Sequence, residues 1–270
     1  MRTRPGTPPN RQVIVATAGR VGSTWTCNLL SGVGFKPGHS LLPGEYLDKN
    51  STLIIDKAVV ALLEVEPFLT WYKSHSLPPP DYVPAEHPTV RFVTILRDPR
   101  DMLVSAADYL AWLDVEMGGK GPAFAALPEA DRILELIERG DWFLDSLERW
   151  QEWPHAIQLH YEDLTRDPKG SFGALLDACD LEPRFDAVAR AVRGNDFATT
   201  TGRRAGVESK GSFLRKGIVG DWRSKFDERC LERFATAKDG RWRRLAEAVA
   251  RRRSGGDAGL HSPAAESPKA

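Results

Sequence analysis

Residues 211–226 (GSFLRKGIVGDWRSKF) combine two adjacent cations with two nearby glycines. The guanidinium of Arg215 offers a planar fork of donors, and the ammonium of Lys216 acts as a point charge. Gly217 and Gly220 allow the main chain to approach a ligand closely. Fixed cations beside backbone N–H groups suit a multiply charged phosphate, so this stretch predicts a phosphate-binding loop.

A second candidate phosphate loop spans residues 17–25 (TAGRVGSTW), between an apolar run expected to form a buried strand and a helix with Ser23 as its expected N-cap. The N–H groups and the dipole at a helix N-terminus favour an anion. Arg20 adds a full positive charge, and Ser23 and Thr24 add hydroxyl donors. Because Gly22 is followed by a serine and not by a lysine, the loop is not a Walker A sequence. An ATP-binding P-loop is therefore disfavoured.

Arg97 and Ser105 form a third candidate anion site. Residues 91–105 (RFVTILRDPRDMLVS) begin with an apolar run expected to form a strand, with Arg97 at its carboxyl end. That edge of an open α/β sheet is where ligands bind. A helix is expected to begin just after Arg97, because Pro99 suits a first turn, and Ser105 follows about two turns later. A surface ion pair between Arg97 and a neighbouring aspartate is the alternative.

Lys73 and His75 are the candidates for acid–base chemistry. They lie two residues apart in WYKSHSLPP (71–79), at the end of the strand expected at 68–73, and therefore share one face. Histidine is the usual general base near neutral pH. A single histidine is more often structural than catalytic, so the residues alone leave both interpretations open.

Together, these four stretches resemble the motifs of PAPS-dependent sulfotransferases (PAPS is 3′-phosphoadenosine 5′-phosphosulfate). The similarity covers residues 13–226. In chain order, the four stretches resemble the family's 5′-phosphosulfate loop, its K[TC]H-x-P segment, its R[ND]PxDxxVS motif and its RKGxxGDW signature. A fifth stretch, LHYEDLTRDP at 159–168, resembles the family's YEDL-DP segment. Arg20 stands where the cytosolic branch has lysine, and in this it is similar to the RSGS-type loop of carbohydrate sulfotransferases.

The resemblance implies transfer of a sulfuryl group from PAPS to the hydroxyl or amine of a small-molecule, lipid or natural-product acceptor, with no metal required. His75 would deprotonate the acceptor, and Lys73 with Arg20 would stabilise charge on the oxygen that bridges sulfur to the 5′-phosphate. Trp25 would stack on the adenine, with Tyr161 nearby. The full set implied to bind PAPS is Arg20, Val21, Gly22, Ser23, Thr24, Trp25, Arg97, Ser105, Tyr161, Arg215, Lys216 and Gly217. The implied ligands of the 3′-phosphate are Arg97, Ser105, Arg215, Lys216 and Gly217.

Two other functions stay open. A P-loop-like small-molecule kinase would depend on ATP and Mg²⁺, and the missing Walker lysine counts against it. A catalytically degenerate nucleotide-binding protein would account for a departure such as Arg20, but not for the retention of Lys73 and His75.

Strands alternate with helices along the chain, which predicts an α/β fold: a single domain with a central, mainly parallel sheet flanked by helices and a P-loop-like nucleotide-binding core. With 270 residues and an apolar fraction of 41%, the chain is long enough for one large domain. Strands are expected at 13–16, 68–73, 91–96 and 156–159, and helices from 23 and 99 and at 128–139, 141–151, 169–180, 183–193, 227–238 and 240–252. The expected domain spans 12–250, between a mobile N-terminus (1–11) and a disordered tail (251–270).

Composition narrows the partners and the compartment. The formal net charge is zero, which argues against nucleic-acid binding by the chain as a whole. Cys27, Cys179 and Cys230 fit neither a zinc pattern nor a disulfide framework, and free thiols suit a reducing compartment. The N-terminus lacks a secretory apolar region, and no run reaches the ~20 apolar residues of a membrane span. We therefore expect a cytoplasmic protein without stable membrane insertion, and the sequence leaves its oligomeric state open.

Overall fold

A five-stranded sheet in the order β3–β4–β2–β5–β6 forms the centre of the molecule, and every neighbouring pair of strands in it is parallel. The computed structural model describes residues 2–3, 10–42, 44–48, 52–64, 68–116, 123–182, 185–209 and 216–254. The strands of the sheet are β3 (Lys36–Pro37), β4 (Leu69–Ser74), β2 (Arg11–Ala16), β5 (Val90–Leu96) and β6 (Ala156–His160). The four strands predicted from the sequence, and the parallel α/β class, are confirmed.

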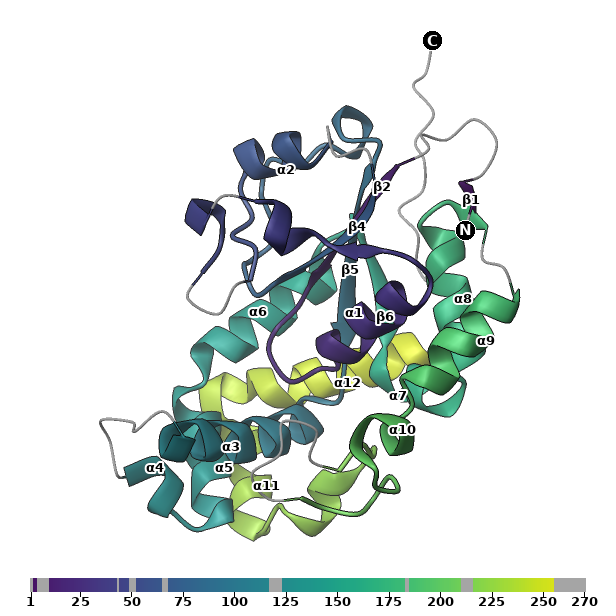
Figure 1. The fold of residues 1–270 in the computed structure, drawn as a ribbon. Coiled ribbons are helices and arrows are strands. Elements are labelled where there is room, and N and C mark those ends of the chain that lie inside the picture. Colours follow the sequence, from purple (N-terminus) through teal and green to yellow (C-terminus); the bar gives the residue numbers. More distant parts are fainter. Residues whose placement is uncertain are drawn as a thin grey trace.

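Helices surround this sheet on both faces and beyond one end of the strands. They are α1 (Ser23–Gly32), α2 (Lys57–Glu64), α3 (Pro99–Glu116), α4 (Ala123–Ala126), α5 (Glu129–Arg139), α6 (Asp141–Glu152), α7 (Tyr161–Arg166), α8 (Pro168–Ala178), α9 (Phe185–Gly194), α10 (Phe197–Thr201), α11 (Glu228–Thr236) and α12 (Arg241–Ser254). Helices α1, α8 and α9 lie on one side of the sheet and α2 and α6 on the other (Figure 1). Helices α3, α5 and α11 pack together beyond one end of the strands.

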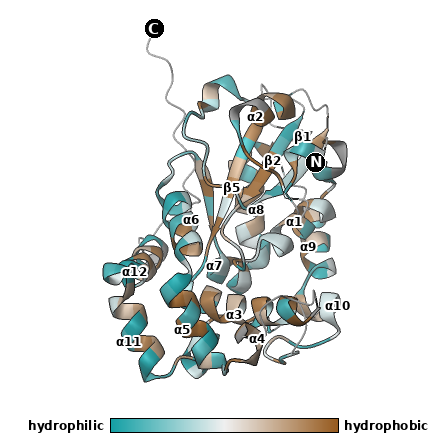
Figure 2. Cartoon of the chain, turned by 90° about the vertical axis from the view of Figure 1, so that its left-hand side faces the viewer, coloured by the Kyte–Doolittle hydropathy of each residue, from teal (hydrophilic) through white to brown (hydrophobic). Residues whose placement is uncertain are grey.

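Burial on both faces explains why the central strands could be predicted from the sequence. In β2, Val13 and Val15 belong to one apolar cluster, and Ile14 and Ala16 belong to a second cluster on the opposite face. A strand buried on both faces reads as a continuous apolar run rather than as an alternating pattern. Figure 2 accordingly shows the sheet strands as largely hydrophobic and the surrounding helices as mixed.

Some details differ from the prediction. Strand β1 (Arg2–Thr3) pairs antiparallel with β7 (Leu181–Glu182), within the N-terminal segment that was expected to be mobile. Arg11, also assigned to that segment, is fully buried in β2. Helix α12 continues past the expected domain end at 250, and residues 255–270 lie outside the described residues, so the disordered tail stays a prediction.

The three cysteines are buried free thiols. Of the helices that the structure describes, none is both long enough and apolar enough to cross a membrane.

The parallel arrangement decides where function can reside. Because the strands run in one direction, the residues that follow β2, β4, β5 and β6 all emerge at one edge of the sheet. The loop after β2 is the candidate phosphate loop, and His75, Arg97 and Tyr161 directly follow the other three strands. The fold therefore gathers stretches that are far apart in the sequence.

Candidate active site

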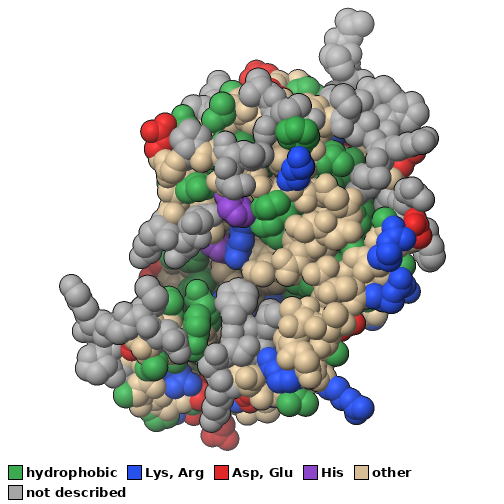
Figure 3. All heavy atoms as spheres, viewed as in Figure 1, with side chains coloured by type: hydrophobic (Ala, Val, Ile, Leu, Met, Phe, Trp, Pro, Cys, Tyr) green, Lys and Arg blue, Asp and Glu red, His purple; other side chains and the backbone are tan. Residues whose placement is uncertain are grey.

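A cavity of about 370 Å³ lies at this carboxyl edge. Figure 3 shows histidine and basic side chains beside a hollow on the corresponding face. The predicted site residues that line the cavity are Arg20, Gly22, Ser23, Thr24, Trp25, Lys73, His75, Arg97, Ser105, Tyr161, Lys216 and Gly217. Arg215 lies outside the described residues, so its predicted contact stays a prediction.

Gly22, rather than Ser23, is the N-cap of helix α1. Its φ of 106° lies in the left-handed region, and a Cβ at this position would come within 2.7 Å of the Tyr161 ring. The prediction of Ser23 as N-cap is therefore wrong by one residue, and Ser23 opens the helix as its first residue. Only glycine combines this backbone conformation with so close an aromatic neighbour. The side chain of Val21 is fully buried in the core, so only its main chain is available to a ligand.

His75 is held as a neutral ring with a defined tautomer. Its Nδ1 lies 2.9 Å from the carbonyl oxygen of Thr17. A carbonyl oxygen only accepts, so Nδ1 donates and carries the proton, which leaves Nε2 as the basic nitrogen. Burial lowers the pKa of the imidazole below its ordinary value, and the bond to Thr17 only partly opposes this. The ring of Trp142 approaches edge-on, with its centroid 6.5 Å from that of His75.

Lys73 points into the same cavity from the end of β4. Its Nζ donates to the hydroxyl of Thr24 at 3.2 Å, which joins it to the first turn of α1. Burial lowers the pKa of the Lys73 ammonium. Lys73 and His75, which the sequence predicted to share one face, both line the cavity.

Arg97 is buried at the end of β5, with 8% of its surface exposed. Its guanidinium donates to the carbonyl oxygen of Arg20 at 2.9 Å and lies 4.3 Å from the centroid of the Tyr161 ring. Among the described residues, its Nε has no hydrogen-bond partner. The neighbouring Asp98 pairs with Arg100, so the alternative of a surface ion pair with Asp98 does not hold.

Lys216 and Gly217 also line the cavity, although they lie far along the chain from the other predicted site residues. The Lys216 ammonium forms an ion pair with the buried Asp221 at 2.6 Å. Gly217 has a φ of 63°, and its Cα lies so close to the Phe197 ring that a Cβ would overlap it. The backbone here therefore needs glycine for its conformation and for the space.

Asp101 ties this segment to the Arg97 region. Its two carboxylate oxygens accept hydrogen bonds from the backbone N–H groups of Gly220, at 2.6 Å, and Trp222, at 3.0 Å. The carboxylate is almost fully buried, and burial raises its pKa although Arg97 and the two N–H donors oppose the shift.

Arg20 lies differently from the expectation that it works beside Lys73. Its Nε donates to the hydroxyl of Ser105 at 3.3 Å, and its guanidinium carbon lies 4.4 Å from the centroid of the Tyr109 ring. Its positive φ of 69° is unusual for a residue with a side chain. The Arg20 side chain is thus directed toward helix α3.

Several lining residues were not singled out as ligands from the sequence: Gly19, Asn28, Tyr109, Thr165, Pro168, Asn195, Asp196, Phe197, Thr200, Ala205 and Ile218. Phe197 begins the short helix α10, for which the sequence offers no apolar period. Tyr109 follows Ser105 by about one helical turn on α3, and this spacing was the signal that could have found it.

The cavity is electropositive. The basic side chains that line it are Arg20, Lys73, Arg97 and Lys216, and the carboxylate among the described lining residues is Asp196. That carboxylate accepts hydrogen bonds from the N–H and the hydroxyl of Thr199 as the N-cap of α10. An excess of fixed positive charge in a partly enclosed site favours a polyanionic ligand. Within the described part of the chain, three or more His, Cys, Asp or Glu side chains do not gather as a metal site.

Known proteins resemble this chain in sequence and in fold. The sequence matches the sulfotransferase domain family over residues 10–244. Sulfotransferase 2A2 of Rattus norvegicus is 27% identical over 156 residues, which cover 53% of each chain. The amine sulfotransferase of Oryctolagus cuniculus is 26% identical over 246 residues, covering 82% of this chain and 77% of that protein. The chain spans about half the length of the sulfotransferase 2A relatives that it matches.

Solved structures share the fold. Mouse sulfotransferase SULT7A1 complexed with PAP (the desulfonated form of PAPS) superposes with a TM-score of 0.60 at 18% identity. The match covers 89% of this chain and 88% of that one. Retinol dehydratase in a complex with retinol and PAP gives a TM-score of 0.56 at 21% identity, over 90% and 82%. Since the family match covers most of the 270 residues, the chain belongs to the sulfotransferase domain family.

Proposed function

We propose that this protein transfers a sulfuryl group from PAPS to a hydroxyl or amine of a small-molecule acceptor, with His75 as general base. One observation carries the proposal: Lys73 and His75 at the end of β4 and Arg97 directly after β5 line one electropositive cavity together with Lys216. The family match and the PAP complexes of structurally similar proteins support the choice of nucleotide.

The described residues fit a nucleotide that carries phosphates at two positions of its ribose. The N-terminus of α1, with Ser23 and Thr24, suits one phosphate. Arg97 with its unpartnered Nε and Lys216 suit the other, beside the close backbone of Gly217. PAPS, when bound, would supply the activated sulfuryl group and the phosphate leaving group.

On this proposal, the chain contributes a base and fixed positive charge. The Nε2 of His75 accepts the proton of the acceptor, while the Thr17 carbonyl keeps the ring oriented and stabilises the imidazolium that forms. The Lys73 ammonium stabilises negative charge on the leaving oxygen, and Thr24 holds the ammonium in place. Charge stabilisation in a site that excludes water is worth more than in bulk solvent.

Trp142 lies on the acceptor side, with its ring edge-on to His75 and 48% exposed. An aromatic wall beside the base favours an acceptor with an apolar body. One similar protein is named amine sulfotransferase, and another, retinol dehydratase, was solved in complex with androsterone. Both support testing amines as well as alcohols as acceptors.

The test is an activity assay of the purified chain with PAPS and a panel of phenols, steroid alcohols and primary amines, read by mass spectrometry. We expect a sulfonated product with PAPS and no phosphorylated product with ATP and Mg²⁺. Phosphorylation by ATP without sulfonation would favour the kinase. PAP binding without turnover on any acceptor, and without hydrolysis of PAPS, would favour the degenerate nucleotide-binding protein.

A further inference from the structure

A short antiparallel ribbon lies along the edge of β4 that faces away from β2. Residues 46–48 pair with residues 52–54, and we call these two arms the edge ribbon. Leu53 also pairs in parallel with the last residue of β4, and its N–H donates to the carbonyl oxygen of Lys73 at 2.7 Å. Since β2 is bonded to the other edge of β4, the edge ribbon lies beside the proposed catalytic pair, Lys73 and His75, on the side away from the candidate phosphate loop.

Asp48 is fixed at the end of the first arm of the edge ribbon. Its N–H donates to the carbonyl oxygen of Thr52 at 2.9 Å, and its Oδ1 accepts from the N–H of Thr52 at 2.9 Å. Arg20 follows β2 and Arg97 follows β5, and both strands lie on the other side of β4 in the order of the sheet. The proposed catalytic pair thus lies between a carboxylate at the edge ribbon and cations on the side of β2 and β5.

The Asp48 carboxylate acts electrostatically on both members of the proposed catalytic pair. Burial lowers the pKa of the Lys73 ammonium and of the His75 imidazole, whereas Asp48 raises the pKa of both. The other groups that act on one or both side chains are the Cys27 thiol, Arg20, the Thr17 carbonyl and, on His75, Lys73 itself. The thiol is neutral at pH 7, because burial raises its pKa to about 12. Among these groups, Asp48 is therefore the one that supplies a negative charge.

We propose that Asp48 is a positioning residue for the transfer: its negative charge keeps the Lys73 ammonium protonated and stabilises the imidazolium that forms when Nε2 of His75 takes the proton of the acceptor. Without this charge, a second positive charge would form on a buried ring beside a buried ammonium, which desolvation and like-charge repulsion both oppose. The role in turnover rests on the proposed function. The effect of the carboxylate on the two side chains does not, because it needs neither nucleotide nor acceptor.

Asp48→Asn isolates the charge from the structure of the edge ribbon. Asparagine keeps an oxygen that can accept from the N–H of Thr52, so the melting temperature is expected to be retained. The matched control is Asp56→Asn, because the Asp56 carboxylate also accepts from a backbone N–H, that of Val59 at 2.8 Å, and is not one of the groups that act on the proposed catalytic pair. A difference between the two variants then reports the position of the charge and not merely the loss of a carboxylate.

The first measurement is an NMR pH titration of the imidazole C–H signals of the full chain without ligand, in which His75→Asn identifies the His75 signal. His75 is expected to titrate at a lower pH in Asp48→Asn than in the unaltered chain, and at an unchanged pH in Asp56→Asn. An unchanged His75 titration in Asp48→Asn would overturn the proposal, whether or not the protein sulfonates an acceptor.

The second measurement is the pH dependence of kcat with PAPS and the acceptor that gives most product. The acid limb reports the loss of neutral His75, and the alkaline limb reports the loss of the Lys73 ammonium. In Asp48→Asn both limbs are expected to move to lower pH, and the maximal kcat to fall about threefold to tenfold, because the imidazolium loses part of its electrostatic stabilisation. A lower kcat with both limbs unmoved would assign the edge ribbon a structural role alone and overturn the proposal. Absence of sulfonation by the unaltered chain would instead overturn the proposed function, and the NMR titration would still decide whether the charge of Asp48 acts on His75.

Discussion

Asp101 and Gly220 are 119 residues apart in the chain, and the carboxylate of the first accepts a hydrogen bond from the backbone N–H of the second at 2.6 Å. The second carboxylate oxygen accepts from the N–H of Trp222. Because Asp101 lies in the first turn of α3, directly beyond Arg97, this contact fixes the Lys216 segment relative to β5. Two candidate anion-binding motifs that are far apart in the sequence are thus joined by one buried carboxylate.

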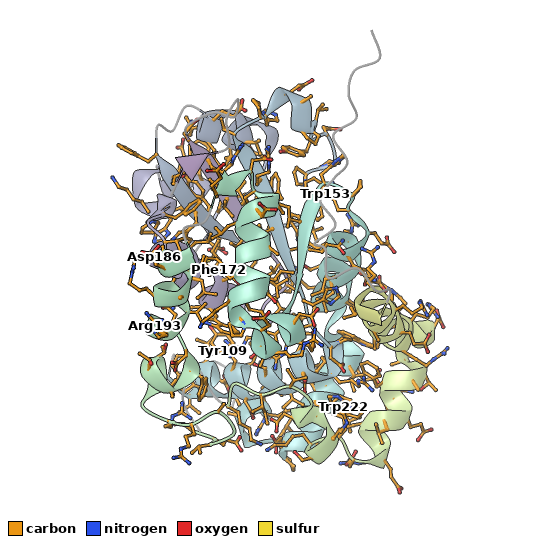
Figure 4. All side chains as sticks on the ribbon, turned by 90° about the vertical axis from the view of Figure 1, so that its right-hand side faces the viewer. Tyr109, Trp153, Phe172, Asp186, Arg193 and Trp222 are labelled. Atoms are coloured by element: carbon orange, nitrogen blue, oxygen red, sulfur yellow. The ribbon has the colours of Figure 1, made fainter. Side chains whose placement is uncertain are left out.

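Replacing Asp101 by alanine should therefore loosen the site. Two partly buried N–H groups lose their acceptor, at a cost of at most about 1–3 kcal/mol each, and the affinity for PAP is expected to fall about tenfold. Denaturant unfolding and calorimetry measure the two effects. The matched control is Asp186→Asn on α9, where the carboxylate forms an exposed pair with Arg190. Figure 4 shows Asp186 and Arg193 along the outer edge of the molecule. If Asp101→Ala binds PAP as the unaltered chain does, this contact does not position the Lys216 segment.

The acid limb of the pH–rate profile should report His75. Burial lowers the pKa of its imidazole, so the neutral base persists below pH 6.5, and kcat/KM is expected to fall only at a midpoint under that value. His75→Asn should reduce turnover about 10²-fold or more and leave PAP binding intact. A midpoint above 6.5, or unchanged turnover in the variant, would remove His75 from the mechanism.

The same shift has a consequence for stability. The folded-state pKa of His75 lies below the unfolded value, so its contribution is present above the unfolded value of about 6.5 and is lost as pH falls toward the folded value. The free energy of unfolding should therefore decrease over this acid interval in the unaltered chain, and by a smaller amount in His75→Gln. Parallel pH dependences of the two proteins would contradict the shift.

The close backbone of Gly217 gives a fourth prediction. In Gly217→Ala the new Cβ meets the Phe197 ring and the positive φ becomes strained, which together cost on the order of 1–3 kcal/mol. PAP affinity should fall about tenfold, because both residues line the cavity. Gly173→Ala is the control, since a Cβ within α8 at that position meets nothing within 4 Å. Equal PAP affinities in the two variants would show that the Gly217 backbone is not part of the nucleotide site.

Lys73 should affect turnover more than binding. Lys73→Met removes the charge from the leaving oxygen, and turnover is expected to fall about 10²-fold, similar to the loss of one oxyanion donor. Lys73→Arg retains charge but cannot reproduce the bond to Thr24, so an intermediate rate is expected. The rates of both variants are measured over a range of PAPS concentrations, which separates kcat from the KM for PAPS. A variant that changes only the KM for PAPS would assign Lys73 to binding alone.

The sequence was sufficient for the strand framework. Strands β2 and β5 contain apolar runs, and α/β alternation implies that the strands of the sheet are parallel, which brings His75 and Arg97 to one edge. Strand β3 was missed because two residues, Lys36–Pro37, carry no apolar period. Helix α10 is similarly short, so its Phe197 could not be placed beside Gly217.

Side-chain direction was the part that local patterns could not supply. Ser23 was favoured as N-cap because serine is common there, but the Tyr161 ring leaves room only for Gly22. The direction of the Arg20 side chain depends on a positive φ and on packing against Tyr109. Both features depend on contacts with segments that lie many residues away.

A crystal structure of the protein with PAP tests the central claim most directly. We predict the nucleotide in the cavity between β4 and α3, with its 5′-phosphate at the first turn of α1 near Thr24 and its 3′-phosphate on Arg97. PAP bound elsewhere, or in this cavity with Arg97 and Lys216 both away from its phosphates, would contradict the account.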